Sequence, residues 1–169
     1  MLVQLEPGAA FGTGQHETTL MCLELCQLYL KQDAKVLDVG CGTGILGIAA
    51  VMLGAHNALE VDRDEVAVNA ARHNAQLNHL TAEQVICMEG NLADAVKGKY
   101  DLIFANIVAD AVITLLPTAK KLMARGASMI ASGIILDREA DVNEAVKRCG
   151  LKVVDRRNRG EWVALAIQK

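Results

Sequence analysis

The sequence predicts an α/β fold, a three-layer sandwich in which a mostly parallel seven-stranded sheet lies between helices and ends in a C-terminal antiparallel hairpin. Three observations predict it. Apolar runs of strand length alternate with helical patterns along the whole chain. The run at 100–105 is apolar almost throughout, as expected of a strand that is covered on both faces. The runs at 151–156 and 162–167 flank a short polar turn, which is typical of a hairpin.

Each element follows from a local pattern. Apolar residues at helical spacing predict five helices, at 17–30, 45–53, 65–77, 112–123 and 137–148. The apolar runs between them predict seven strands, at 35–39, 57–61, 84–88, 100–105, 127–132, 151–156 and 162–167. Pro117 cannot donate a hydrogen bond inside the fourth helical pattern, so we expect a kink or two short helices there. Gly150 is expected to end the fifth helix.

The bulk properties define the class of protein. A length of 169 residues with 52% hydrophobic content suits a single domain that spans residues 1–169 and has a full-sized core. The formal net charge of -3 argues against direct nucleic-acid binding. No apolar stretch approaches the length of a membrane span, and the first residues lack a basic region followed by an apolar core. We therefore expect a cytoplasmic protein that does not contact a membrane.

The five cysteines are an odd number without C-x-x-C spacing. Cys22 and Cys26 would lie one helical turn apart, which supplies only half of a metal site, and His16 is the only nearby imidazole. We expect reduced, mostly buried thiols and no metal site.

The most informative motif places Asp38 before Gly40, Gly42 and Gly44, between a predicted strand and a predicted helix. Such glycines let the backbone turn sharply and bring exposed amide groups at a helix N-terminus close to a ligand. A dinucleotide fingerprint would need its third glycine at Ile45, so the pyrophosphate-binding pattern is not met. The motif predicts a nucleotide-like cofactor; a glycine-rich turn without a ligand is the alternative.

A second acid supports a nucleotide-like cofactor. Asp62 ends the strand at 57–61, about twenty residues after the glycines, where ribose-binding folds place a carboxylate. Asp62 or Asp64 could instead cap the next helix, and we assign the ribose to Asp62 and the cap to Asp64. Glu60 is a weaker candidate for the ribose because it comes one pair of residues earlier on the same face.

Polar or glycine residues follow four predicted strands of the sheet. They are Gly40 to Gly44, Asp62, Gly90 with Asn91, and Asn106. Ligands of such sheets bind beyond the carboxyl ends of the strands, where the winding direction changes. The sequence therefore predicts that these residues meet at one crevice.

The motif at 38–44 resembles motif I of the class I S-adenosylmethionine-dependent methyltransferases, which have a Rossmann-like fold. Residues 5–19, together with 106–110, 132–134 and 160–164, closely resemble the PrmA family, which methylates large-subunit ribosomal protein eleven. The similarity covers nearly all of the chain but only the catalytic domain of that family. We therefore expect the family's N-terminal substrate-recognition domain to be absent.

The resemblance implies S-adenosylmethionine as the cofactor and a ribosomal protein as the substrate. The cofactor-binding residues that it implies are Thr19, Asp38, Gly40, Gly42, Gly44, Asp62, Asn91 and Asn106. Asn91 stands where an acid is common in the family. Phe11 and the turn at 12–14 would lie over the methyl-donor pocket, which makes Phe11 a candidate catalytic residue beside Asn106. The alternative for this segment is a plain loop before a helix that Thr18 caps.

The resemblance also implies methylation of amino groups, on lysine side chains and the N-terminus of the substrate. No residue stands out as a dedicated base. Asn106 would orient the amine through its side-chain carbonyl, or else cap the following helix, and His16 is expected to be a loop hydrogen-bonding residue rather than a base. A nucleic-acid base methyltransferase is less well matched, since Ile107 and Val108 replace its usual prolines. A small-molecule methyltransferase and an inactive cofactor-binding module are further alternatives.

Overall fold

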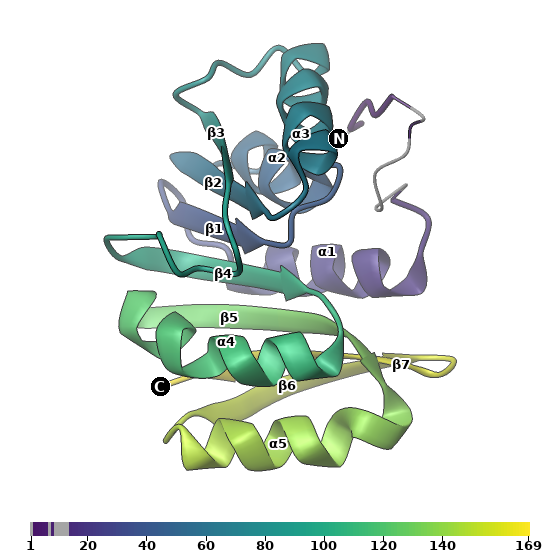
Figure 1. The fold of residues 1–169 in the computed structure, drawn as a ribbon, viewed down its shortest axis with the longest axis vertical. Coiled ribbons are helices and arrows are strands. Elements are labelled where there is room, and N and C mark those ends of the chain that lie inside the picture. Colours follow the sequence, from purple (N-terminus) through teal and green to yellow (C-terminus); the bar gives the residue numbers. More distant parts are fainter. Residues whose placement is uncertain (1, 7, 9–13) are drawn as a thin grey trace.

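The protein is described by a computed structural model that covers residues 2–6, 8 and 14–169, and its seven strands form one sheet in the order β3-β2-β1-β4-β5-β7-β6 (Figure 1). The strands are β1 (Lys35–Val39), β2 (Asn57–Asp62), β3 (Val85–Glu89), β4 (Tyr100–Asn106), β5 (Met123–Ile135), β6 (Lys152–Arg159) and β7 (Trp162–Gln168). Strands β1 to β5 are parallel, and β7 is antiparallel to both β5 and β6. The expected mostly parallel sheet with a C-terminal antiparallel hairpin is confirmed.

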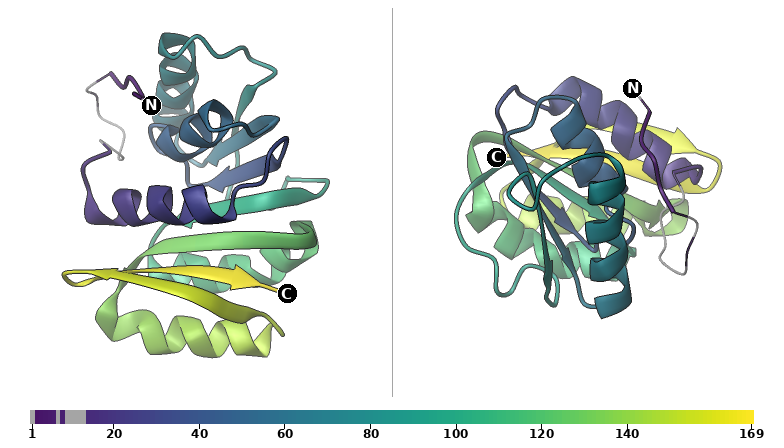
Figure 2. Two further views of the ribbon diagram at one scale, coloured as in Figure 1. Left: turned by 180° about the vertical axis from the view of Figure 1, so that it is seen from behind. Right: turned by 90° about the horizontal axis from the view of Figure 1, so that it is seen from above.

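Helices cover both faces of the sheet, which makes three layers (Figure 2). The helices are α1 (Glu17–Tyr29), α2 (Ile45–Met52), α3 (Glu65–Leu77), α4 (Ala109–Leu122) and α5 (Glu139–Arg148), with a short 3₁₀ turn η1 (Leu136–Arg138) before α5. One apolar cluster joins α1 and α2 to one face of the sheet, with Phe104 of β4 among its fully buried residues. A second cluster joins α4 and α5 to the other face, with Ile103 among its buried residues. Successive β4 side chains thus enter opposite layers.

Two elements differ from the expectation in physically simple ways. Helix α4 runs unbroken through Pro117, so the expectation of two short helices is wrong. Pro117 is exposed, while Leu116 and Ala119 on either side of it are buried against the sheet and hold both halves of α4 in place. The fifth helix ends as expected, because Gly150 adopts φ +68 and its N–H donates to Lys147 O at 2.8 Å.

The N-terminal residues lie along α3 and are held by two asparagines. Asn78 accepts the Gln4 N–H through Oδ1 at 2.9 Å and donates Nδ2 to Gln4 O at 2.7 Å. The buried Asn74 accepts the Glu6 N–H at 3.0 Å and donates to Thr43 O at 2.9 Å, in the turn before α2. One side chain therefore connects the N-terminal segment, α3 and the glycine-rich turn.

The chain winds in one direction from β1 to β3 and in the other from β4 onward, so the carboxyl ends of β1 and β4 lie at the point of reversal. Open α/β sheets bind ligands at this position.

Candidate functional site

The turn between β1 and α2 is built on three glycines with positive φ. Gly40, Gly42 and Gly44 adopt φ values of +73, +55 and +78, which side-chain-bearing residues rarely adopt. The N–H groups of Gly40 and Cys41 both donate to Val61 O, at 2.8 and 3.1 Å, and tie the turn to the end of β2. The backbone of the turn, rather than any side chain, therefore forms this wall of the site.

Asp62, at the end of β2, has both carboxylate oxygens fixed by backbone groups. Oδ2 accepts the Gly42 N–H and Oδ1 accepts the Asp64 N–H, each at 3.0 Å. Asp64 caps α3, since its Oδ1 accepts the Val66 N–H at 2.9 Å. The assignment of the helix cap to Asp64 is thus confirmed. Asp62 stays available to a ligand, because a carboxylate offers about four acceptor positions.

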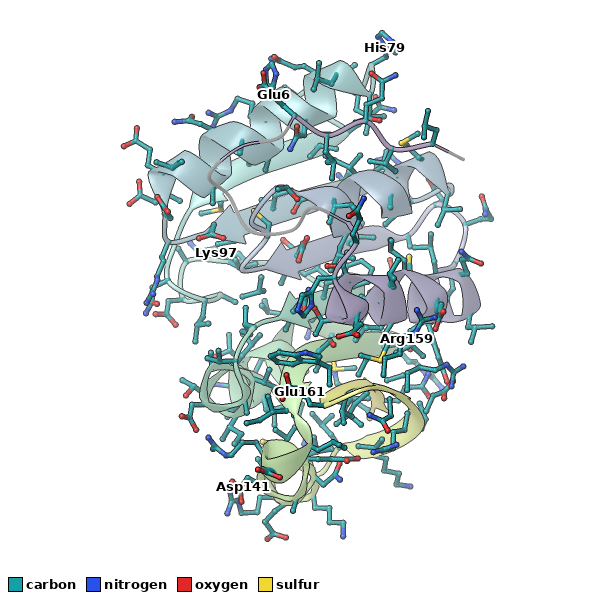
Figure 3. The ribbon with its side chains drawn as sticks, turned by 90° about the vertical axis from the view of Figure 1, so that its right-hand side faces the viewer. Glu6, His79, Lys97, Asp141, Arg159 and Glu161 are labelled. Atoms are coloured by element: carbon teal, nitrogen blue, oxygen red, sulfur yellow. The ribbon has the colours of Figure 1, made fainter. Side chains whose placement is uncertain are left out.

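A cleft of about 890 Å³ opens at the carboxyl ends of the strands, the side of the molecule that Figure 3 faces. Five of the residues expected to bind the cofactor or the acceptor line it: Gly40, Gly42, Asp62, Asn91 and Asn106. Further lining residues, which the sequence did not single out as site residues, include Thr18, Arg63, Leu92, Gly133 and Trp162. The strand ends of β1, β2, β3 and β4 therefore contribute to a single cavity, as expected.

Asn106 occupies the end of β4, beside Ser132 of β5. Its Oδ1 is buried and has no hydrogen-bond partner among the described residues. The N-cap of α4 is Val108, so the alternative in which Asn106 caps that helix is wrong. Gly133 packs against the backbone of Ile107, the residue after Asn106. A Cβ on Gly133 would lie only 2.5 Å from Ile107 O. This close approach fixes the backbone that leads out of Asn106.

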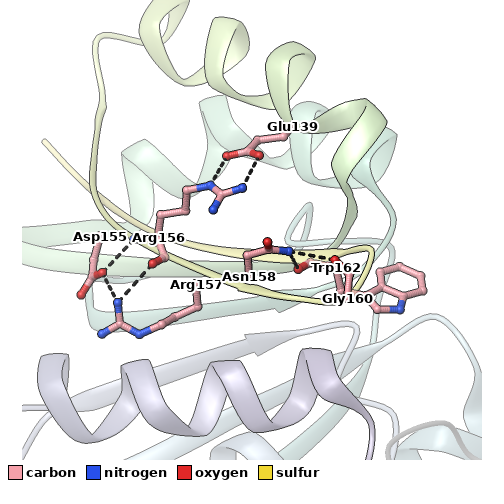
Figure 4. A network of polar contacts seen from close by, with 7 residues as sticks. All are labelled: Glu139, Asp155, Arg156, Arg157, Asn158, Gly160 and Trp162. Carbon is pink, nitrogen blue, oxygen red and sulfur yellow. Dashed lines mark hydrogen bonds and ion pairs between the residues drawn. The ribbon is translucent and has the colours of Figure 1, made fainter.

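His16 and Trp162 form the wall across the cleft. His16 is the N-cap of α1: its Nδ1 accepts the Thr18 N–H at 3.3 Å and lies 2.8 Å from Thr18 Oγ1. The expected hydrogen-bonding role of His16 is confirmed, and the alternative cap by Thr18 is wrong. The rings of His16 and Trp162 meet edge to face, with centroids 5.3 Å apart. Asn158 Nδ2 supports this wall by donating to Gly160 O and Trp162 O, at 3.0 and 2.9 Å (Figure 4).

Other expected site residues lie outside the cleft wall. Thr19 is fully buried on α1, and its Oγ1 has no partner among the described residues. Gly44 lies where α2 meets α3, and a Cβ there would come 2.9 Å from Ala71 Cβ, so its visible role is helix packing. Asp38 is 1% exposed. Phe11 and the turn residues 12 and 13 lie outside the described residues.

Asp38 and Glu60 form a pair of buried carboxyl groups beneath the glycine turn. They are aligned partners on β1 and β2. Burial raises the pKa of Asp38 to about 7 and raises that of Glu60 well above its usual range, with the charge of Asp38 adding to the rise for Glu60. Gly47 of α2 leaves the space for Glu60, because a Cβ there would overlap Glu60 Oε1. Glu60, the weaker candidate for the ribose in the sequence, is fully buried and is not among the residues that line the cleft.

The described residues contain no group of three or more histidine, cysteine or acidic side chains that would hold a metal ion. Cys22, Cys26 and Cys41 are buried as free thiols, and burial raises the pKa of Cys26 to about 12. No helix in the described part of the chain combines the length and apolar character that crossing a bilayer requires.

Comparisons with known proteins give consistent results. A family model described as ribosomal protein L11 methyltransferase (PrmA) matches residues 1–169. A protein of that name from Clostridium botulinum (strain Eklund 17B / Type B) is 44% identical over 162 residues, which cover 96% of this chain and 51% of the relative. Another from Alkaliphilus oremlandii (strain OhILAs) is 41% identical over 166 residues, which cover 98% of this chain and 52% of the relative. The chain thus spans about half the length of these curated relatives.

The fold also matches a solved structure. The crystal structure of a ribosomal protein L11 methylase from Lactobacillus delbrueckii subsp. bulgaricus superposes with a TM-score of 0.92 and 32% sequence identity, covering 99% of this chain and 84% of that one. The family model matches the whole chain, and the two relatives and the solved structure each cover 96% or more of it. The chain belongs to the PrmA family of ribosomal protein L11 methyltransferases.

Proposed function

We propose that this chain is the cofactor-binding and catalytic domain of an S-adenosylmethionine-dependent protein N-methyltransferase that acts on amino groups of ribosomal protein L11. The observation that carries the proposal is Asp62 beside the glycine turn, in a cleft that Asn106 also lines. Membership of the PrmA family and the names of the relatives support the same activity and substrate. A ribosomal protein substrate also implies that the enzyme works in the cytoplasm.

The residues present fit the proposed cofactor. The cleft volume of about 890 Å³ falls in the range of small-molecule sites. Backbone N–H groups already hold the Asp62 carboxylate in place, so its remaining lone pairs can accept hydrogen bonds from the two adjacent hydroxyls of a ribose. Gly40 and Gly42 present bare backbone to the cleft, which allows a flat purine or an amino-acid moiety to approach closely.

The bound cofactor would supply a methyl group on a positively charged sulfur, which a neutral amine takes by in-line displacement. The work of the chain is therefore to hold the amine neutral, close and collinear with that methyl group. A lysine has an ordinary pKa near 10.4, and transfer from water into a partly apolar cleft favours loss of its proton. We assign to the amide of Asn106, which lines the cleft, the role of orienting the amine. His16 and Trp162 line the same cleft and would limit access of water.

Two measurements test this function. Calorimetric titration with S-adenosylmethionine checks cofactor binding, and transfer of a labelled methyl group to purified ribosomal protein L11 checks the reaction. We expect binding with a 1:1 stoichiometry and label on amino groups of the acceptor. Folded protein that takes up no cofactor would contradict the proposal. Cofactor binding without transfer to any amine would instead favour a binding module.

A further inference from the structure

The charged side chains of this protein are unevenly divided between the two ends of the sheet. We define the basic pole as the end at which the parallel strands begin. It is made up of the last turns of helices, the segments that lead into the strands, the first residues of the strands and the C-terminal residue. It carries Lys31, Lys35, Lys97, Lys99, Lys120 and Lys121. It also carries Arg125, Lys147, Arg148, Lys152 and Lys169.

These eleven side chains are most of the 17 lysines and arginines in the sequence. Only three side-chain carboxylates among the described residues share this end, namely those of Asp33, Glu83 and Asp101. The remaining six cations and 17 acidic side chains lie elsewhere, and many of the acidic ones are at the opposite end of the sheet, where the helices begin. The formal net charge of -3 therefore conceals a strongly positive end and a strongly negative end.

Intramolecular ion pairs do not neutralise the basic pole. None of the eleven cations forms an ion pair with a described residue. Four of them donate instead to neutral backbone carbonyls: Lys31 to Gly126, Lys99 to Lys121, Lys120 to Cys149 and Lys169 to Met123, at 2.6 to 2.9 Å. These contacts join the segment before β4, α4, β5 and the loop before β6 at the same end of the sheet.

Four of the six arginines outside the basic pole, unlike its cations, form ion pairs with described residues. Arg138 pairs with Asp110, Arg156 with Glu139, Arg157 with Asp155 and Arg159 with Glu24, and Figure 4 shows two of these pairs. Interaction with helix dipoles accounts for the cations in the last turns of α4 and α5 but not for those that precede β1 and β4. The positive charge of this end therefore remains available to an external anion.

A small pocket of about 200 Å³ lies within the basic pole. Lys35, Lys97 and Lys99 contribute to its wall, together with the apolar side chains of Leu59 and Ile86 and the ring of Tyr100. A pocket with apolar and aromatic walls beside several cations suits a nucleotide base that carries phosphates on either side. A bilayer surface offers the phosphates but no planar ring to occupy the pocket.

We propose that the basic pole binds RNA through its phosphate backbone, at the end of the molecule opposite the cleft. The choice of RNA over an acidic protein rests on the proposed function, because a ribosomal protein substrate is itself found with RNA. The net charge alone had argued against nucleic-acid binding, and the distribution of the charges is what changes that inference.

The test uses fluorescence anisotropy with a labelled single-stranded RNA of about 20 nucleotides, in the absence of cofactor. We expect a Kd in the micromolar range at low salt that weakens at least tenfold between about 50 and about 200 mM KCl, as for roughly three neutralised phosphates. The double variant Lys97→Glu/Lys121→Glu should weaken binding by about tenfold or more, since neither side chain makes a hydrogen bond in the described structure.

A matched control reverses two cations outside the basic pole, in Arg63→Glu/Arg72→Glu, which changes the net charge equally and should leave RNA affinity within about twofold. Circular dichroism checks that both variants fold, and Lys97→Gln/Lys121→Gln replaces the first variant if it does not. Equal losses in both variants, no RNA binding, or binding only to phosphatidylglycerol vesicles would each overturn the proposal. Cofactor titration of Lys97→Glu/Lys121→Glu should match the parent chain, so failure of the methyltransferase function would be recognised separately.

Discussion

Asp62 is the side chain on which the proposed cofactor site most depends. Its carboxylate combines two fixed backbone contacts with a position on the cleft wall. Replacement by alanine removes charge-assisted hydrogen bonds to the ribose, and we expect S-adenosylmethionine binding to weaken by about 1.5–3 kcal/mol, roughly tenfold to a hundredfold in Kd. Calorimetry gives the value directly. Asp62→Asn keeps the shape of the side chain and one acceptor oxygen, so its affinity for the cofactor should lie between those of the parent chain and Asp62→Ala. Unchanged affinity in Asp62→Ala would place the ribose elsewhere.

The buried pair Asp38 and Glu60 predicts an unusual dependence of stability on pH. Because burial raises the pKa of Asp38 from 3.8 to about 7, the folded state binds more protons than the unfolded state between these values. The free energy of unfolding should therefore fall as the pH rises through this window, and the raised pKa of Glu60 adds to the fall. The contribution of this pair is therefore largest on the acid side, opposite to that of Asp110 and Glu139, whose pKa values are lowered by hydrogen bonds to Arg138 and Arg156.

Glu60→Gln tests this explanation because it removes one ionisable group without changing the volume. We expect the free energy of unfolding at pH 7.5 to rise on the order of 1–3 kcal/mol and the decline with pH to become shallower. Urea denaturation across the pH range measures both. The exposed Glu83→Gln is the control and should follow the parent chain. If the unfolding free energy changed with pH equally in the parent chain, Glu60→Gln and Glu83→Gln, the buried pair would not be the source of the pH dependence.

Sequence reasoning succeeded for residues whose position follows from strand ends and was less informative for buried ones. Asp62 and Asn106 follow strands directly, so their approach to the cleft is a matter of topology. The burial of Glu60, the partner of Asp38, depends on the space that Gly47 of α2 leaves, which residue spacing does not encode. Trp162 lies far along the chain, and it reaches the cleft because β7 is inserted next to β5.

At the level of elements, the contact of α2 with α3 depends on Gly44. Gly44→Ala should cost stability in two ways, through its positive φ and through overlap with Ala71 Cβ. Gly98→Ala is a matched control, because Gly98 also has a positive φ, of +97, while a Cβ there meets nothing within 4 Å. We expect Gly44→Ala to lower the unfolding midpoint in urea more than Gly98→Ala, by a difference equivalent to about 1–3 kcal/mol. Equal losses of stability in Gly44→Ala and Gly98→Ala would mean that the positive φ alone, and not overlap with Ala71, causes the loss.

The contact of α3 with the N-terminal segment gives a more local prediction. Asn78→Ala removes both hydrogen bonds to the backbone of Gln4, so the amide of Gln4 should exchange with solvent roughly fivefold faster or more, equivalent to ~1 kcal/mol. Hydrogen exchange resolved by residue measures this. Gln76→Ala, on the exposed side of α3, should leave the exchange rate of Gln4 unchanged. Unaltered exchange in Asn78→Ala would mean that other contacts hold the segment.

The order and type of the elements could be predicted because their patterns are long and regular, and α3 was expected at the same bounds that the structure shows. The extent of β5 was not predictable, since its first residues include Arg125 and Gly126, which have no strand pattern. Pairing with β4 and β7 extends β5 at both ends beyond the predicted 127–132. The continuity of α4 through Pro117 likewise depends on burial of its flanks and not on local propensity.

At the scale of the whole molecule, the location of the cleft could be predicted from the sequence, but the side-chain contacts within it could not. The reversal of strand order determines where a ligand binds, and this follows from the alternation of helices and strands alone. The distribution of charge between the two ends is a property of the folded chain, because it arises when separate loops are brought to the same end of the sheet.

A body with cations at one end and carboxylates at the other has a large permanent electric dipole moment, directed along the strands. In the field of an approaching protein such a body experiences a torque and rotates before any contact is made. A lysine-rich protein therefore meets the carboxylate-rich end first, while a polyanion meets the far end. Two oppositely charged molecules can accordingly approach at the same time without competing for one surface.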